Sequence, residues 1–453
     1  MLLRFIAENA LSFKEATEFN LFPSSKSHSH EWHKMKCGHA TAMRFSAIYG
    51  ANGAGKSNLI DLIELMKNLV IEGNLGILEN SENLKFKFDS QCSDKPISMA
   101  VEFFVSQNVY YYQIEFNERR VFHESLLLSG KTKDEPIFKR DWGDAKSVLY
   151  FNEKYSGKKI TDSLVDAFER VLRPDMLLLT FLARFYPEEI KQVKDAFRWF
   201  NSRLQIVKPI SLSGNIPQLM DTDKKFNAFV NQLLPEFKTG ITKLDVEAVE
   251  LTGDKTKLND EMQEALAKAK QQPGLPQPVM GPLKKGIQNI VFENDKYYLK
   301  RLLPTHVCSD GQSVDIPFES ESDGTMRMIE YMPLFYLILH FPVVFLVDEM
   351  ERSIHPILIK EMINKLSKDK GLKGQLIFST HESHLLDQEI FRPDEIWFAE
   401  KDDHQATQLY PLSDYNIHKT ANIENGYLLG RYGAIPFLST LNQLHWYDDQ
   451  PKS

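Results

Sequence analysis

Eight consecutive residues, Gly50 to Ser57, have the composition and spacing of a loop that binds phosphate groups. Their sequence, GANGAGKS, satisfies the pattern GxxxxGK[ST]. Glycines let the backbone curl so that successive N–H groups point at phosphate oxygens, and a following helix adds the partial positive charge of its N-terminus. We expect Lys56 to reach the β- and γ-phosphates of a nucleotide and Ser57 to hold Mg²⁺ through its hydroxyl. The other expected nucleotide-binding residues in and after this loop are Gly50, Asn52, Gly53, Ala54, Gly55 and Asn58.

A phosphate loop needs a carboxylate to complete its metal site, and the second half of the chain supplies one. The apolar run 343–347 is typical of a parallel strand buried on both faces, and it ends at Asp348 and Glu349. We expect Asp348 to bind Mg²⁺, directly or through water, and Glu349 to orient and deprotonate the attacking water. A second apolar run, 375–380, ends at His381. Strand ends at one edge of such a sheet converge on the ligand, so His381 is expected to sense the γ-phosphate.

Periodic patterns predict the elements that position these residues. Two short strands are expected within 3–22 and a helix at 57–70, so that a strand, the glycine loop and a helix follow in that order. Because Lys56 and Asp348 lie about 290 residues apart, a large insertion must separate the two halves of the site. The insertion is expected to hold an antiparallel β-meander at 97–128, helices at 163–204, 224–234 and 260–270, and an exposed proline-rich loop at 273–282.

Composition limits the class of protein. The 453 residues are 42% hydrophobic and 26% charged, which excludes disorder and a coiled-coil rod, and the net charge of −8 excludes a bulk nucleic-acid coat. Three cysteines without a CxxC pair exclude a disulfide framework and a four-cysteine zinc site. The uncharged stretch 331–347 is short for a membrane span and is interrupted by Pro333 and Pro342. We therefore expect a soluble, cytoplasmic protein.

Several further segments carry a resemblance to a known family. The stretches are AIYGANGAGKSNL, ESESDGTMRM, LVDEMERSIHP, LIFSTHESHLLD, FRPDEIWF and GRYGAIPFL. Together they resemble the prokaryotic AAA/ABC-type ATPases of abortive-infection and phage-defence systems, which are relatives of the OLD (overcoming-lysogenisation-defect) and SMC ATPases. The resemblance covers roughly residues 1–70 and 300–440. About 70 residues follow His381, too few for the Toprim nuclease domain of OLD proteins, and the long heptad arms of SMC proteins are missing.

The resemblance implies a fold and a mechanism. The fold class would be α/β, a P-loop ABC-type ATPase head with an inserted β-meander and a helical subdomain. Ser322 and Gly324 would belong to a signature motif that caps the γ-phosphate held by a second subunit, so that two ATP and Mg²⁺ are sandwiched in a head-to-tail homodimer or higher oligomer. Residues 352–356 would form the D-loop, and Gln113 is a weak candidate for the Q-loop. The expected parts are residues 1–160 (N-terminal half of the head), 161–299 (helical insertion) and 300–453 (C-terminal half).

The resemblance also implies a biological role, a sensor or scaffold in antiviral defence that controls a separately encoded effector such as a nuclease or toxin. Three alternatives stay open: a DNA repair or recombination ATPase acting directly on nucleic acid, an interaction module that binds ATP and hardly hydrolyses it, and a transporter ATPase. Among weaker clusters, the crowded His28, His30, His33, Cys37 and His39 match no common zinc-site spacing and predict a solvated loop. The basic pairs Arg119-Arg120, Lys158-Lys159 and Lys284-Lys285 predict solvated faces.

Overall fold

A computed structural model of the protein describes residues 1–78, 84–143, 146–156, 160–209, 215–252, 259–280, 287–418 and 421–435. The chain divides into two compact units. Unit 1 comprises residues 1–206, 346–348 and the described residues from 375 onward, and unit 2 comprises 207–345 and 349–374. Unit 1 therefore contains the phosphate loop, and unit 2 contains the expected signature motif. In the described part of the chain, no helix is long and apolar enough to cross a membrane.

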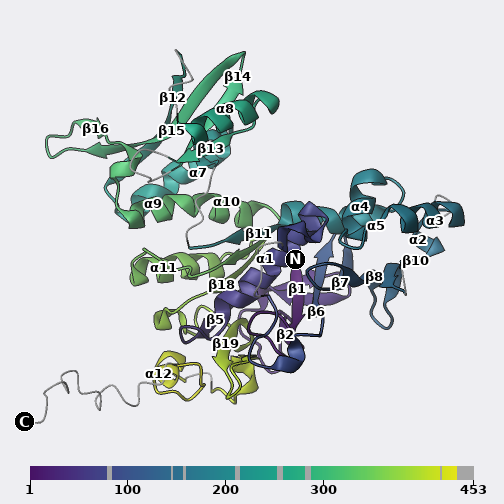
Figure 1. Cartoon of the computed structure of the whole chain (residues 1–453). Helices are drawn as coiled ribbons and strands as arrows, with labels where there is room; N and C mark the ends of the chain where they lie inside the picture. The colour runs from purple at the N-terminus through teal and green to yellow at the C-terminus, as the bar shows by residue number, and fades with distance from the viewer. Residues whose placement is uncertain are drawn as a thin grey trace, which may run out of the picture. The chain divides into compact units, whose positions relative to one another are not determined.

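The central sheet of unit 1 carries the phosphate loop. Its strand order is β11-β17-β18-β5-β19-β20, and β18 and β19 both run parallel to β5 (Figure 1). Strands β5, β17 and β18 are buried throughout, as continuous apolar runs predict for parallel strands covered on both faces. The phosphate loop connects β5 to the helix α1 (Lys56–Glu72), so the expected strand, loop and helix are confirmed. The strands are β5 (Phe45–Gly50), β11 (Leu204–Val207), β17 (Val344–Val347), β18 (Gln375–Ser379), β19 (Ile396–Lys401) and β20 (Thr407–Pro411).

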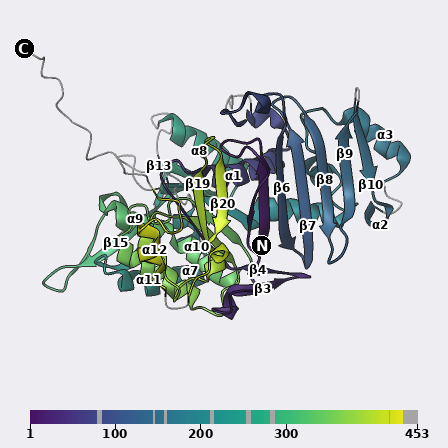
Figure 2. The ribbon, with the colours of Figure 1, turned by 90° about the horizontal axis from the view of Figure 1, so that it is seen from below.

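A second sheet of unit 1 confirms the β-meander and extends it. Seven strands follow the order β10-β9-β8-β7-β6-β1-β2, and Figure 2 shows β6 to β10 side by side. The pairs β6–β7, β7–β8, β8–β9 and β9–β10 are antiparallel, so the meander continues two strands beyond its expected end at residue 128. The strands are β1 (Leu2–Glu8), β2 (Thr17–Asn20), β6 (Ile97–Val105), β7 (Asn108–Phe116), β8 (Val121–Ser129), β9 (Glu135–Trp142) and β10 (Ser147–Phe151).

A buried carboxylate joins this sheet to a helix. Glu124 on β8 accepts hydrogen bonds from the backbone N–H groups of Leu178 (2.6 Å) and Leu179 (2.8 Å), at the start of α4 (Leu178–Phe185), and from the hydroxyl of Tyr112 (3.0 Å). Burial raises the pKa of Glu124. A carboxylate at a helix N-terminus satisfies otherwise unpaired N–H groups and interacts favourably with the helix dipole. Glu124 therefore fixes α4 on the meander.

The sequence patterns misplaced two parts of unit 1. The stretch expected as a continuous helix with one proline break is divided into separate helices, ends in a π-helical turn at Trp199–Arg203 and then enters β11. The polar stretch expected as a loop contains a short hairpin. The remaining elements of unit 1 are β3 (Lys34–Cys37), β4 (Ala40–Met43), α2 (Glu153–Ser156), α3 (Asp162–Val171), α5 (Lys191–Arg198) and α12 (Ile423–Leu428).

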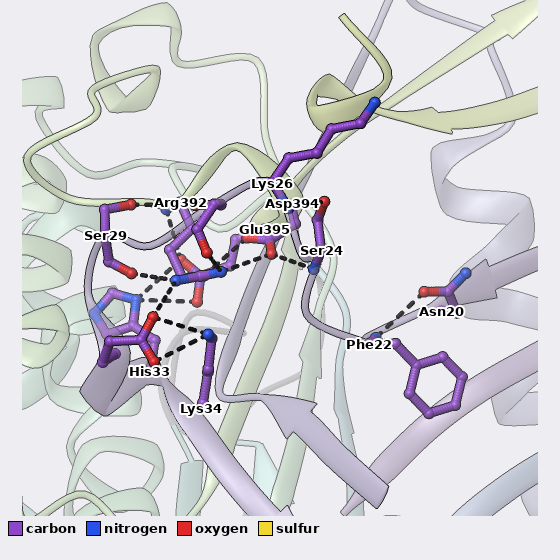
Figure 3. Close-up of polar contacts among 12 residues, drawn as sticks. Asn20, Phe22, Ser24, Lys26, Ser29, His33, Lys34, Arg392, Asp394 and Glu395 are labelled. Carbon is purple, nitrogen blue, oxygen red and sulfur yellow. Dashed lines mark hydrogen bonds and ion pairs between the residues drawn. The ribbon is translucent and has the colours of Figure 1, made fainter. Parts of the chain in front are cut away.

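A buried ionic cluster attaches this polar stretch to the segment that precedes β19 (Figure 3). Arg392 donates from Nε to Asp394 (2.9 Å) and from its two terminal nitrogens to Asp394 and to the backbone carbonyls of Ser27 and Ser29. Nδ1 of His33 lies 2.9 Å from a carboxylate oxygen of Glu395, and neither side chain is exposed. Burial raises the pKa of Glu395. The sequence predicted a solvated loop for this histidine-rich stretch, and that prediction is wrong for His33 and Cys37, which are both buried, His33 against the carboxylate of Glu395.

Unit 2 contains a mixture of strands and helices. A sheet of order β12-β15-β14-β13, with β16 paired to β15, accompanies helices α6 to α11. The proline-rich loop was predicted wrongly in part, because Gln277–Met280 forms β13 and pairs with β14. Its strand lies at the edge of the sheet, where a proline leaves no ladder hydrogen bond unmade. The elements are α6 (Ile216–Thr222), α7 (Lys224–Leu233), β12 (Ile241–Glu250), α8 (Asp260–Gln271), β13, β14 (Ile287–Glu293), β15 (Lys296–Val307), β16 (Ser313–Asp315), α9 (Asp323–Glu330), α10 (Met332–His340) and α11 (Pro356–Ser367).

The Arg392 cluster can be tested by hydrogen exchange. Arg392→Met keeps the apolar stem of the side chain but leaves the buried carboxylate of Asp394 without its cation, at a cost of about 3 kcal/mol. We expect the backbone amides of residues 24–33 to exchange faster, because the arginine no longer holds the Ser27 and Ser29 carbonyls. Arg431→Met, at an exposed position, is the control. Unchanged protection of residues 24–33 in Arg392→Met contradicts this account.

Candidate functional site

The phosphate loop has the geometry expected from its sequence. Lys56 is the first residue of α1, and its side-chain ammonium donates to the carbonyls of Gly50 (2.8 Å) and Ala51 (3.2 Å). The first turn of α1 contains no acidic residue, so no carboxylate of that turn offsets the positive end of the helix dipole. Asn52 and Gly53 are exposed at the tip of the loop. The loop thus places one buried cation at the start of a helix whose first turn has no acidic residue, which suits a bound phosphate chain.

A chain of hydrogen bonds, which the sequence did not suggest, holds this loop from outside. Nδ2 of Asn58 on α1 donates to Oγ of Ser12 (2.8 Å), which lies 2.8 Å from Oγ1 of Thr407. Oγ1 of Thr407 also lies 2.9 Å from the carbonyl oxygen of Ala54 in the loop. A hydroxyl has one proton and a carbonyl can only accept, so Thr407 donates to Ala54 and Ser12 donates to Thr407. The backbone N–H of Thr407 adds a bond to the carbonyl of Ser12 (2.7 Å).

Gly55 is required by this arrangement for two reasons. Its φ of +105° lies in the region that residues with a side chain rarely adopt. A Cβ at Gly55 would also collide with Oγ1 of Thr407 and lie 2.9 Å from Oγ of Ser12. The absence of a side chain is thus what allows the two hydroxyls to approach the loop.

Asp348 lies at the same edge of the sheet as the phosphate loop. Oγ of Ser379, the last residue of β18, donates to Oδ1 of Asp348 at 2.5 Å, and both side chains are buried. This bond places the ends of β17 and β18 together, and β18 runs parallel to β5, which leads into the loop. Ser379 orients the carboxylate through one oxygen, so the second oxygen can serve a cation. A serine hydroxyl at Ser57 and a carboxylate oxygen at Asp348 are hard oxygen donors, which fit Mg²⁺.

His381 follows β18 at this edge and is exposed to solvent. Two residues before it, Ser379 binds Asp348, so the strand that positions the carboxylate also leads to the histidine. The position agrees with a side chain that approaches a bound phosphate from outside. Gln113, the weak Q-loop candidate, lies on β7, and its side-chain amide donates to Glu115 (3.1 Å).

In unit 2, the expected signature motif packs against the expected D-loop. Oγ of Ser322 accepts a hydrogen bond from the backbone N–H of Thr325 (3.1 Å) and so caps α9. A Cβ at Gly324 would lie 2.7 Å from the carbonyl oxygen of Ser353, which itself has a φ of +64°. The hydroxyl of Tyr331, at the end of α9, donates to the carbonyl of Met350 (3.1 Å). The two segments are therefore in contact at both ends of α9.

Charged side chains flank this contact. Arg327 on α9 pairs with Glu330 (3.2 Å), and its guanidinium lies 4.7 Å from the ring centre of Tyr331. Burial raises the pKa of Glu330, despite the arginine, and raises that of Tyr331 to about 12. Glu349 has a φ of +49°, and one of its carboxylate oxygens lies 4.0 Å from Arg352. The carboxylate expected to activate water thus follows Asp348 on a tight backbone turn.

The structure describes only some of the weaker clusters of the sequence. Among the residues that the structure describes, no three His, Cys, Asp or Glu side chains gather as metal ligands would. Arg120 stacks on the ring of Trp142 at 5.0 Å, while Lys158-Lys159 and Lys284-Lys285 lie outside the described residues. Ser12, Ser379 and Thr407, in contrast, were missed, because their roles depend on contacts between segments far apart in the chain.

The fold and the site define an α/β nucleotide-binding domain of the P-loop class. Residues 45–387 match the family described as "AAA domain, putative AbiEii toxin, Type IV TA system", and the chain belongs to this family. The match begins at β5 and ends just after His381, so it includes both halves of the site. The predicted AAA/ABC-type ATPase domain is confirmed at this level. No curated protein matches the sequence.

Solved structures of SMC heads are also similar to this chain. An SMC head bound to the C-terminal winged-helix domain of ScpA has a TM-score of 0.40 and 14% identity, covering 90% of this chain and 97% of that one. The SMC head domain from Thermotoga maritima has a TM-score of 0.36 and 12% identity, covering 92% and 99%. An SMC head from Pyrococcus furiosus, with an extended coiled coil and bound to the C-terminal domain of ScpA, has 0.35 and 13%, covering 90% and 96%.

Thr407→Val tests whether the hydrogen-bond chain positions the phosphate loop. Valine keeps the shape of threonine but removes the donor to Ala54 and the acceptor for Ser12, at a cost of about 1–2 kcal/mol. If that cost falls on nucleotide binding, the Kd for ATP measured by isothermal titration calorimetry should rise about 5-fold to 30-fold.

Two further variants make this test specific. Thr407→Ser retains the hydroxyl and should restore affinity, which a loss of folding alone would not predict. Thr17→Val removes an exposed threonine hydroxyl on β2, bonded only to a local carbonyl at 3.0 Å, and should bind ATP normally. Equal affinity in Thr407→Val and the wild type contradicts the positioning role.

Proposed function

We propose that this protein is an ATPase that binds ATP with Mg²⁺, hydrolyses it and dimerises around it. The observation that carries the proposal is the phosphate loop at the end of β5, with Asp348 at the same edge of the sheet. Mg²⁺, held by Ser57 and Asp348, would neutralise part of the phosphate charge. This function extends the family's description as an AAA domain to a specific reaction.

Each residue of the proposed site has a separate role in hydrolysis. The loop amides and Lys56 bind the phosphates, so Lys56 must exchange the Gly50 and Ala51 carbonyls for phosphate oxygens. Glu349 accepts the proton of the attacking water, and His381 donates a hydrogen bond to the γ-phosphate. Ser379 positions Asp348 from behind. The bond between water and phosphorus forms while the bond to the leaving ADP oxygen breaks.

The signature motif completes the site from a second copy of the chain. Ser322 lies at the N-terminus of α9, so its hydroxyl and the first backbone N–H groups of the helix would approach the γ-phosphate bound by the partner subunit, while Asp323 in the first turn offsets part of the helix dipole. The close packing of Gly324 on Ser353 joins this motif to the D-loop of the same chain. Closure of one site therefore moves the segment that follows Glu349, which supports a head-to-tail homodimer whose two sites act together.

The biological role that we propose is nucleotide-dependent control of a separately encoded effector, such as a nuclease or a toxin, in defence against phages. The family's description as a putative toxin of a toxin–antitoxin system supports a role in such systems. A relationship to OLD ATPases belongs to the same proposal. The ATP-bound dimer and the ATP-free protein would present different surfaces to the effector.

Lys56→Ala tests nucleotide binding. Removing the ammonium leaves the phosphate charge without its cation, so we expect ATP to bind roughly 100-fold more weakly in equilibrium dialysis. Lys67→Ala, three turns further along α1, is the control and should bind normally. Unchanged affinity in Lys56→Ala would remove the basis for the phosphate-loop assignment.

Ser322→Arg tests the contribution of the second subunit. The long cationic side chain blocks the start of α9, so we expect ATP binding near the wild-type value, while phosphate release and ATP-dependent dimerisation fall more than tenfold. Ser320→Arg introduces the same charge at an exposed position two residues earlier and should retain both activities. Normal turnover by Ser322→Arg contradicts a signature that acts between subunits.

A further inference from the structure

Three helical segments of unit 2 line an apolar groove of ≈ 610 Å³ that the proposed ATPase site does not use. Its residues come from α7 and the 3-10 turn that follows at 234–237, from α10, and from α11. The size lies within the range of binding pockets for small ligands and side chains. The groove belongs to unit 2 alone.

The apolar residues of the groove recur at helical spacing. On α11 and on the segment through α7, the apolar positions are four residues apart, so each set forms one stripe along a helical face. The stripe on α11 extends over about 12 Å, or a little more than two helical turns. Two such stripes leave holes into which the side chains of a third helix fit. The stripes are Phe229, Leu233 and Phe237 on one side and Leu358, Met362 and Leu366 on the other, with Phe335 and Leu339 from α10.

These apolar side chains are incompletely covered by the chain itself. Met362, Leu366 and Phe335 are buried, whereas Leu358 and Leu339 remain half-exposed. The stripe on the opposite side, Phe229, Leu233 and Phe237, is also only half-buried. Contiguous apolar surface in a depression, surrounded by polar groups, is characteristic of an interaction site.

The rim of the groove is acidic. Glu236, Glu361 and Asp369 are exposed and carry three negative charges, against one positive charge at Lys365, which gives a net charge of −2. An occupant with acidic flanks would be repelled, and one with basic flanks would be attracted. The rim therefore selects the charge of the ligand, and the stripes select its shape.

We propose that this groove binds an amphipathic helix of a separate protein, apolar at positions i, i+4 and i+7 and carrying Lys or Arg on both flanks. Helix-in-groove recognition of this kind reads a few apolar anchors and a charged border. A second copy of this chain is a less suitable occupant, because its net charge of −8 opposes the rim. The groove thus supplies a docking site for the partner protein.

The groove is built on the helices that leave the signature motif and the D-loop. Tyr331 is the one residue between α9 and α10, and α11 begins at Pro356, the last residue of the expected D-loop. The hydrogen bond from Tyr331 to the carbonyl of Met350 joins the segment between α9 and α10 to the segment that leads through the D-loop to α11. This consequence rests on the proposed function: ATP-driven dimerisation, which acts on both segments, would alter the distance between α10 and α11 and so the affinity of the docked helix.

Fluorescence anisotropy with two labelled peptides tests the groove. Both are 15-residue helix formers with the same leucine stripe; one carries lysine and the other glutamate at the flanking positions. We expect the lysine peptide to bind the full-length protein without nucleotide at least tenfold more tightly than the glutamate peptide, and this preference to decrease with added salt. A photoreactive residue in the lysine peptide should crosslink to α7 and α11.

Matched variants locate the binding. Glu361→Lys should weaken the lysine peptide about fivefold and Leu358→Asn about tenfold, whereas Glu264→Lys, the same charge change on the exposed face of α8, should leave it unchanged. The proposal would be overturned if both peptides bound equally or if the crosslinks formed elsewhere. It would also be overturned if sedimentation showed a dimer that Glu361→Lys dissociates, because a second copy of the chain would then occupy the groove. ATP binding is measured in parallel, so a failed docking site and a failed ATPase assignment give different results.

Discussion

The shape of the phosphate loop depends on a relay of hydrogen bonds between side chains from three distant segments. Asn58, Ser12 and Thr407 come from a helix, from the turn between β1 and β2, and from the edge strand β20, and each donates to the next until the relay ends on the Ala54 carbonyl. The glycines of the loop favour no single conformation, so its shape depends on this relay together with the bonds from Lys56 to the carbonyls of Gly50 and Ala51. Because Gly55 has no side chain, the hydroxyls of Ser12 and Thr407 can approach the loop, and their hydrogen bonds restrain the loop backbone. A loop that is already ordered reduces the ordering cost of binding a phosphate chain.

Features that depend on neighbouring residues could be predicted from the sequence, whereas features that depend on contacts between distant segments could not. The phosphate loop and the buried strand before Asp348 could be predicted because their residues are close together in the chain and their pattern is itself the signal. The signature role of Ser322 and Gly324 came from the resemblance and stays a prediction. Ser12 and Thr407 are 395 residues apart, and neither has a local pattern that marks it. β13 was missed because prolines normally interrupt strands, and only its place at the edge of a sheet makes Pro278 tolerable. The π-helical turn at Trp199–Arg203 was missed because the hydrophobic period continues through it while the backbone geometry changes.

In unit 2, the backbone from Glu349 to Ser353 contributes both to the proposed catalytic site and to the contact with α9. Glu349 and Ser353 both have positive φ, so the D-loop leaves β17 through two tight turns. Strained backbone at such positions persists only where surrounding contacts hold it, and the Tyr331–Met350 bond and the packing of Ser353 on Gly324 are those contacts. The segment that carries the proposed general base is thereby attached to the proposed signature helix, and the docking groove lies on the two helices that continue from them. A partner at the groove and a nucleotide at the loop would bias the same element, which is the physical requirement for coupling two sites.

The central claim is that two copies of the chain close around ATP bound at the phosphate loop. Native mass spectrometry of Glu349→Gln protein with ATP and Mg²⁺ tests it most directly, because loss of the general base should trap the complex before hydrolysis. We expect a homodimer that retains two ATP molecules and dissociates when ATP is replaced by ADP. A protein that stays monomeric with ATP bound, or a dimer that forms equally well without nucleotide, would contradict it.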